Sequence, residues 1–125
     1  MEKFIVEASE DTPYICIDYD SGIIEFQGKS LPEDSVAFFT PVDAAIRNYI
    51  ENPKPKTIIN LRLEYLNSSS QKKMVLLISL FEILTINGLE VDVNWFFKEE
   101  DEDMQDEGFE FSRMISLPLN ILPDA

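Results

Sequence analysis

The 125-residue chain contains no histidine, a single cysteine and only four glycines. Without histidine it lacks the usual general base near neutral pH, the Ser-His and Cys-His catalytic pairs and the ligands of most zinc sites. The lone Cys16 can form no disulfide within the chain, and its position in a β-like segment predicts a buried, reduced thiol.

Basic residues are also scarce, because 10 Lys and Arg are set against 24 Asp and Glu and the net charge is −14. Such a charge repels nucleic acid and anionic membranes and favours partners with basic surfaces. No apolar run approaches the roughly 18 residues needed to cross a bilayer. The first residues show no signal-peptide pattern. We therefore expect a cytoplasmic protein that neither inserts into membranes nor binds nucleic acid.

The chain does have enough apolar residues for a core, since 45% of its residues are hydrophobic and 11% are aromatic. This composition is typical of a globular protein rather than a disordered one. A chain of this length buries about two-thirds of its surface on folding. We predict one domain covering residues 1–125.

The hydrophobic periodicity predicts strands alternating with helices. Residues 14–27 suit an antiparallel strand pair that turns at 20–22, and the strand–helix–strand pattern at 57–97 suits a parallel crossover. The predicted strands are 3–8, 14–19, 23–27, 57–63, 89–97 and 115–119, and the predicted helices are 30–51, 71–87 and a short one ending near Gly108. Pro41 should kink the first helix or divide it in two. The prediction is an α/β fold with a mixed sheet of five to six strands and about three helices.

The two longer predicted helices carry apolar faces. On the first, the predicted core face comprises Val36, Phe39, Val42, Ala45, Ile46, Tyr49 and Ile50. On the second, it comprises Met74, Leu77, Ile78, Phe81 and Leu84, while Val75, Leu76, Leu80, Ile83 and Ile86 make most of the remaining surface apolar as well. Such a helix either lies between the sheet and the first helix or presents a groove to a partner protein.

Between the strand 57–63 and the helix 71–87 lies the serine turn, which comprises Asn67, Ser68, Ser69 and Ser70. The first backbone N–H groups of a helix have no partner within the helix, and Ser and Asn side chains commonly cap them. The same N–H groups and the helix dipole also favour a phosphate. Two interpretations follow: a hydroxyl that only caps the helix, or phosphorylation of Ser68.

Acidic residues are concentrated in the segment 99–110, where eight of twelve residues are Asp or Glu. The run from Asp101 begins like a calcium loop, but Gln105 stands at a ligand position and Asp106 stands where the loop requires glycine. We interpret the run as a solvated acidic loop with a short helix. The alternative is a weak, hydrated Mg²⁺ site.

The remaining polar residues give little support for catalysis. Glu64, at the end of the strand 57–63, is expected to be either a surface residue or an anchor for Lys72 or Lys73. Ser68 and Lys72 are the only local nucleophile–base candidates, and nothing there would desolvate the lysine. We therefore predict that the chain is not an enzyme and has no catalytic residue, cofactor or structural metal.

Three separated segments carry a resemblance to a known family. They are residues 22–35 (GIIEFQGKSLPEDS), residues 63–70 (LEYLNSSS), and residues 93–97 (VNWFF) followed by the acidic run. In this order they resemble the SiaC-like regulatory phosphoproteins. The serine turn also resembles the Asp-Ser-Ser-Gly turn of anti-anti-sigma (STAS-type) proteins, whose first serine is phosphorylated. The resemblance implies a STAS-like fold.

The resemblance also implies a phosphorylation site and partners. The phosphorylated residue of SiaC-like proteins is the Thr or Ser after the Asn, which is Ser68 here, with Ser69 and Ser70 as adjacent alternative acceptors. In those systems a dedicated serine/threonine kinase phosphorylates the protein, a PP2C-type phosphatase dephosphorylates it, and the free form activates a diguanylate cyclase that makes cyclic-di-GMP. The expected partner surface comprises Tyr65, Leu66, Asn67, Ser69, Ser70, Lys72 and Lys73. A constitutive scaffold or subunit without a phosphoswitch is the alternative.

Overall fold

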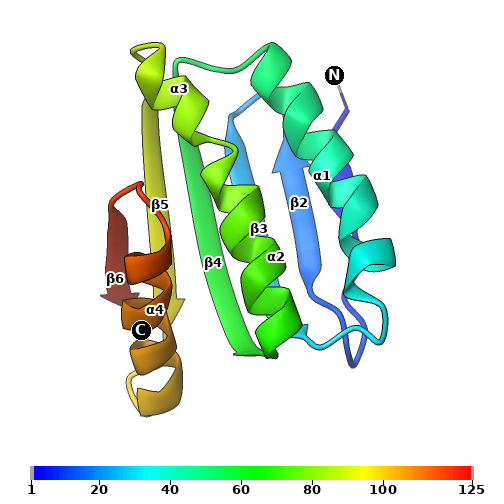
Figure 1. Cartoon of the computed structure of the whole chain (residues 1–125), viewed down its shortest axis with the longest axis vertical. Helices are drawn as coiled ribbons and strands as arrows, with labels where there is room; N and C mark the ends of the chain where they lie inside the picture. Colours follow the sequence, from blue (N-terminus) through cyan, green and yellow to red (C-terminus); the bar gives the residue numbers. More distant parts are fainter. Residues whose placement is uncertain (1, 125) are drawn as a thin grey trace.

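The computed structural model describes residues 2–124, so Met1 and Ala125 of the expected 1–125 domain lie outside the described residues. A six-stranded sheet carries all its helices on one face (Figure 1). In chain order the elements are β1 Phe4–Val6, β2 Tyr14–Asp18, β3 Ile23–Ser30, α1 Ser35–Glu51, β4 Lys56–Leu66, α2 Ser68–Ser79, α3 Glu82–Ile86, β5 Glu90–Phe97, α4 Glu102–Met114 and β6 Leu119–Pro123.

The strands lie side by side in chain order. β1, β2 and β3 pair antiparallel, whereas β3, β4, β5 and β6 pair parallel. The chain passes through at least one helix between each pair of parallel strands, because parallel neighbours require a long crossover connection. The predicted mixed α/β sheet is therefore confirmed, with six strands.

The core lies between the sheet and the helix layer. Alternate side chains of the central strands point into it, and none of Phe26, Ile59, Leu61 and Trp95 has any exposed surface. Burying each such side chain contributes about 1.5–3 kcal/mol to folding. The core stripe predicted for 71–87 is confirmed, because all five of its residues are buried.

The start of α1 differs from the prediction. Ser30 belongs to β3, and the helix begins only after Asp34, whose carboxylate accepts a hydrogen bond from the Ala37 N–H at 3.0 Å. The expected division at Pro41 is wrong, because one helix runs from Ser35 to Glu51 with this proline inside it. Val36, expected in the core, is 59% exposed.

The predicted helix 71–87 begins earlier than expected and is divided into α2 and α3. The Ser79 hydroxyl donates to the Val75 carbonyl at 2.7 Å, a contact that tends to bend helices. The N–H groups of Leu80 and Phe81 then bond three residues back instead of four, which ends α2. α2 lies beside α1 in one layer (Figure 1), so the expected place between the sheet and α1 is wrong.

The acidic run forms most of α4, which continues past Gly108 to Met114. The prediction that the helix ends near Gly108 is wrong. Gly108 lies inside the helix against the Trp95 ring, and a Cβ added to it would approach Trp95 Cδ1 to 2.6 Å. The last strand is Leu119–Pro123 rather than 115–119. Asp124, expected at a loose end, donates its N–H to the Phe97 carbonyl at 2.7 Å.

The face of the sheet opposite the helices carries a row of paired residues that crosses all six strands. The row consists of Ile5, Cys16, Glu25, Asn60, Asn94 and Asn120. Its side-chain amides form a chain of hydrogen bonds of 2.9–3.0 Å from Asn120 to Glu25. Cys16 is 8% exposed and unpaired, which confirms the predicted buried thiol. Among residues 2–124 no helix is long and apolar enough to span a bilayer.

Candidate functional site

The serine turn lies where β4 ends and α2 begins. Asn67 has extended backbone angles and caps α2, because its side-chain oxygen accepts the Ser70 N–H at 2.9 Å. Its own N–H donates to the Ser30 carbonyl at 3.0 Å, which ties the turn to the end of β3. The cap is thus the asparagine and not a serine hydroxyl.

Ser70 lies beneath the turn rather than on its surface. Its hydroxyl accepts a hydrogen bond of 2.8 Å from the Ser30 hydroxyl, and neither serine has any exposed surface. Leu66 is also buried, at 6% exposure. These two residues of the expected partner surface therefore support the turn and are not available for direct contact, and Ser70 is not available as an acceptor.

Ser68 and Ser69 are exposed at the first two positions of α2. The Ser69 hydroxyl donates to the Asn67 side-chain oxygen at 3.3 Å, whereas the Ser68 hydroxyl has no hydrogen bond to any residue within 2–124. A group added to the Ser68 hydroxyl would therefore break no existing hydrogen bond among the described residues. It would also lie at the positive end of the helix dipole.

The flanking residues of the expected surface are accessible to different degrees. Tyr65 is 50% exposed, Lys72 is exposed, and Asn67 and Lys73 are half-buried. Glu64 is a surface residue, which was one of the two expectations, and it does not anchor Lys72 or Lys73. It lies on the helix-free face of the sheet, with its carboxylate 4.0 Å from the Lys98 ammonium.

A polar contact links the first turns of α2 to α4. The Gln71 amide donates to the Glu107 carboxylate at 2.7 Å. Burial raises the pKa of Glu107 above its ordinary value, and the nearby Glu110 raises that pKa further, while the Gln71 bond opposes the shift. The acidic run therefore touches the helix that bears Ser68, a contact that the sequence reading missed.

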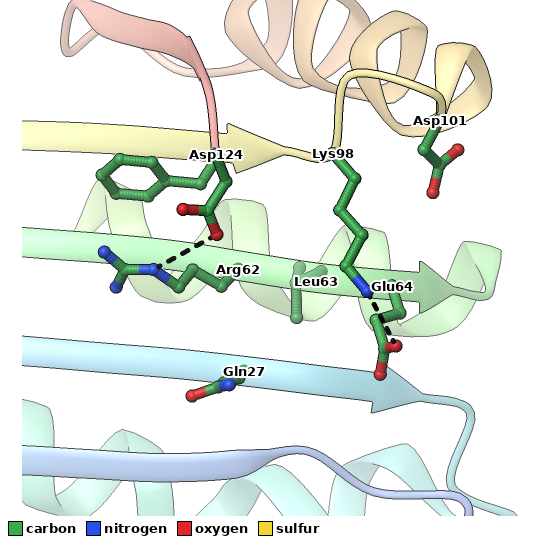
Figure 2. A pocket seen from close by; sticks show the side chains of 8 residues that line it. Gln27, Arg62, Leu63, Glu64, Lys98, Asp101 and Asp124 are labelled. Carbon is green, nitrogen blue, oxygen red and sulfur yellow. Dashed lines mark ion pairs between the residues drawn. The ribbon is translucent and has the colours of Figure 1, made fainter.

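A pocket of about 170 Å³ lies on the helix-free face, at the carboxyl ends of β4 and β5 (Figure 2). Arg62 stacks over the Phe96 ring at 4.1 Å and donates to Glu25 at 2.9 Å, with Asp124 at 3.8 Å. Since Arg62 and Lys98 are both paired with carboxylates, the pocket offers no free cation for an anionic ligand. In the sequence, the charged residues Arg62 and Glu64 alternate with apolar ones along β4, and this alternation could have indicated a polar site on the helix-free face.

The described part of the chain contains no cluster of three or more Cys, Asp or Glu arranged to hold a metal ion. In the acidic run, Asp101 caps α4 by accepting the Met104 N–H at 3.1 Å. Glu102 and Asp103 lie in the first turn of the helix, where its dipole favours negative charge. The run therefore has a structural role.

Fold and turn together agree with the family resemblance. Residues 6–124 match the model of the SiaC family regulatory phosphoproteins, and the chain belongs to this family. An uncharacterised protein of Pseudomonas aeruginosa strain UCBPP-PA14 is 29% identical over 121 residues, which are 97% of this chain and 96% of that protein.

Two solved structures from Pseudomonas aeruginosa are similar over their whole length. One is a crystal structure of the diguanylate cyclase SiaD in complex with its activator SiaC, with a TM-score of 0.88 and 28% identity, covering 97% of this chain and 99% of that one. The other is apo-SiaC, with a TM-score of 0.85 and 28% identity, covering 98% of this chain and 99% of that one.

Proposed function

We propose that this protein is a non-enzymatic signalling protein that is regulated by reversible phosphorylation of Ser68. Its unphosphorylated form binds and regulates an effector, which we take to be a diguanylate cyclase. The observation that carries the proposal is the exposed, unbonded Ser68 hydroxyl at the first position of α2, in a chain of the SiaC family. The similarity to an activator bound to its cyclase supports the choice of effector.

Phosphorylation would act on the partner rather than on the fold. It adds about −1.5 to −2 charges and three strong acceptor oxygens. At a helix N-terminus this charge is tolerated or mildly stabilising. A partner packed over the turn would have to bury the phosphate or withdraw, and burying an unpaired charge is costly. A loss of about 3–4 kcal/mol weakens binding on the order of several hundred-fold.

The proposal includes three partners in the cytoplasm: a cognate serine/threonine kinase, a PP2C-type phosphatase and the cyclase. The protein acts as one domain. The partner surface comprises the accessible side chains around Ser68, namely Tyr65, Asn67, Ser69, Lys72 and Lys73.

Mass spectrometry after incubation with the kinase tests the acceptor. We expect phosphate on the wild type and on a Ser69→Ala control, and none on Ser68→Ala. Ser69 is the matched control because it is the adjacent exposed serine of the same helix turn. Equal labelling of Ser68→Ala and the wild type would end the assignment.

A binding titration with the purified cyclase tests the consequence. The phosphorylated protein should bind on the order of several hundred-fold more weakly than the unphosphorylated protein. Ser68→Asp should show a smaller loss, since aspartate carries less charge and fewer acceptor oxygens than a phosphate. Equal affinities of the two phosphorylation states would reject the proposed control.

The exposed apolar side chains of α2 and α3 favour one second candidate, a constitutive scaffold or subunit. Leu76 is 63% exposed and Ile83 is 42% exposed. In that case the protein forms a fixed complex whose stability does not change with phosphorylation. Sedimentation of both phosphorylation states at equal concentration separates the two functions.

A further inference from the structure

α2 is the only helix among the described residues without an acidic side chain, although the chain contains 24 acids. Its two lysines, Lys72 and Lys73, lie one turn after Ser68. Within residues 2–124 no carboxylate lies within ion-pair distance of either lysine, whereas Lys56, Arg62 and Lys98 are all paired. A strongly acidic molecule thus keeps two free cations beside the serine turn.

A groove of about 160 Å³ runs between α1 and α2 next to these lysines. Its rim carries two large exposed apolar side chains, Val36 at 59% and Leu76 at 63% exposure, and Lys73 lines it. The one acid that lines it, Asp43, is already bound by Arg47 at 2.7 Å. The groove therefore combines four apolar side chains with one lysine that no carboxylate of residues 2–124 neutralises.

We infer that this groove docks an amphipathic helix of the cyclase that inserts an aliphatic side chain between Val36 and Leu76 and places carboxylates on Lys72 and Lys73. The inference rests on the proposed function and names the chemistry of the partner. Helices commonly bind grooves of this kind through apolar anchors spaced by one turn. Charge complementarity decides the flanking residues, since most of this acidic molecule repels an acidic helix, whereas Lys72 and Lys73 are adjacent cations without a competing carboxylate in the described part of the chain.

The same arrangement explains how a phosphate at Ser68 acts on the groove. Ser68 and Lys72 are four residues apart, and side chains at this spacing are neighbours on a helix. Two lysines carry +2 charges and a phosphate about −1.5 to −2, so phosphorylation cancels the local positive charge. An acidic helix is then no longer attracted to the groove, and the phosphate also occupies space above the turn that the helix would need.

The groove is tested by titrating the purified cyclase from the same organism with unphosphorylated variants of this protein and measuring the Kd of each. Leu76→Ser and the double variant Lys72→Gln/Lys73→Gln should each bind at least about tenfold more weakly than the wild type. The loss in the lysine variant should shrink between 50 mM and 500 mM salt, because salt screens exposed charges.

Two control variants remove the same kinds of side chain, one apolar and one basic, at the other end of the helix layer. Ile86→Ser removes a side chain that is 76% exposed at the end of α3, and Lys54→Gln removes a lysine after α1. The end of α3 and the loop that follows α1 lie at the end of the molecule opposite the start of α2 (Figure 1). We expect the Kd of each control to stay within about twofold of the wild type. Circular dichroism should show that all the variants are folded, since exposed substitutions have small effects on stability.

The outcomes separate the docking inference from the proposed function. If Leu76→Ser and the lysine variant bind like the wild type while phosphorylation abolishes binding, the groove is wrong and the phosphoswitch stands. If both variants lose affinity while phosphorylation has no effect, the groove stands and the switch fails. Failure of the unphosphorylated wild type to bind the cyclase overturns both.

Discussion

At the scale of single residues, the hydrogen bond between Ser30 and Ser70 joins the end of β3 to the first turn of α2. Both hydroxyls are fully buried, so each depends on the other for a partner. A buried polar group that loses its partner costs about 1–3 kcal/mol, more than the bond itself contributes. This pair therefore fixes which serines of the turn remain accessible.

We expect Ser70→Ala to lower the free energy of unfolding by about 1–3 kcal/mol, because it leaves the Ser30 hydroxyl without an acceptor. Urea denaturation measures the change. Ser69→Ala, which alters only an exposed hydroxyl of the same turn, should shift stability by less than about 0.5 kcal/mol. In the double variant Ser30→Ala/Ser70→Ala the loss should be smaller than the sum of the two single losses. Additive losses would contradict the proposed pairing.

The sequence predicted which residues form the turn at the start of the helix, because capping depends on neighbours within one helix turn. It did not show which serine is buried. That outcome depends on Ser30, which lies 40 residues earlier and was assigned to the start of a helix. Contacts across such a separation leave no local periodicity to read.

At the scale of elements, the helices differ most from the sequence prediction. The apolar spacing of 71–87 continues unbroken through Phe81 and Leu84, so the pattern gave no sign of the division after Ser79. At the division, the Ser79 hydroxyl bonds the Val75 carbonyl and the next backbone N–H groups bond three residues back, and neither contact is visible in the apolar spacing. For α4, the sequence predicted a helix that ends near Gly108, whereas the buried residues Met104, Gly108 and Phe111 continue the helical spacing past that glycine.

We expect Gly108→Ala to destabilise the protein by about 1–3 kcal/mol, the usual cost of overpacking. Alanine favours a helix over glycine by about 1 kcal/mol, but the added Cβ would approach the Trp95 ring to 2.6 Å, and the clash outweighs the propensity. Thermal unfolding measures the effect. Asp106→Ala in the same helix is exposed and should change stability little. A rise in Tm for Gly108→Ala would show that α4 can move away from the sheet.

The raised pKa of Glu107 gives a pH dependence with a definite sign. A carboxyl whose pKa is higher in the folded state binds its proton more readily there, so its contribution to stability rises as the pH falls from neutral toward the ordinary value of about 4.5. Glu107→Gln should therefore raise Tm at pH 7 and reduce this dependence. Asp106→Asn, at an exposed position of the same helix that is not among the causes of the shift, is the control. A lower Tm for Glu107→Gln at pH 7 would contradict the assignment.

At the scale of the whole molecule, the charge of −14 predicts a response to salt. Repulsion among 24 acids opposes the compact state, whereas the surface ion pairs contribute only about 0–1 kcal/mol each. Screening should weaken the repulsion more than the pairs. We expect Tm to rise by a few degrees between 10 mM and 200 mM NaCl, with KCl giving the same rise. A fall in Tm would show that the ion pairs dominate.

The burial of Cys16 makes the protein suitable for labelling without further engineering. Since this is the only thiol in the chain and it is only 8% exposed, a cysteine introduced at an exposed site such as Ile86 would be the only one to react readily with a maleimide dye. Fluorescence anisotropy of that dye could follow partner binding in real time, with the reporter far from the turn it observes.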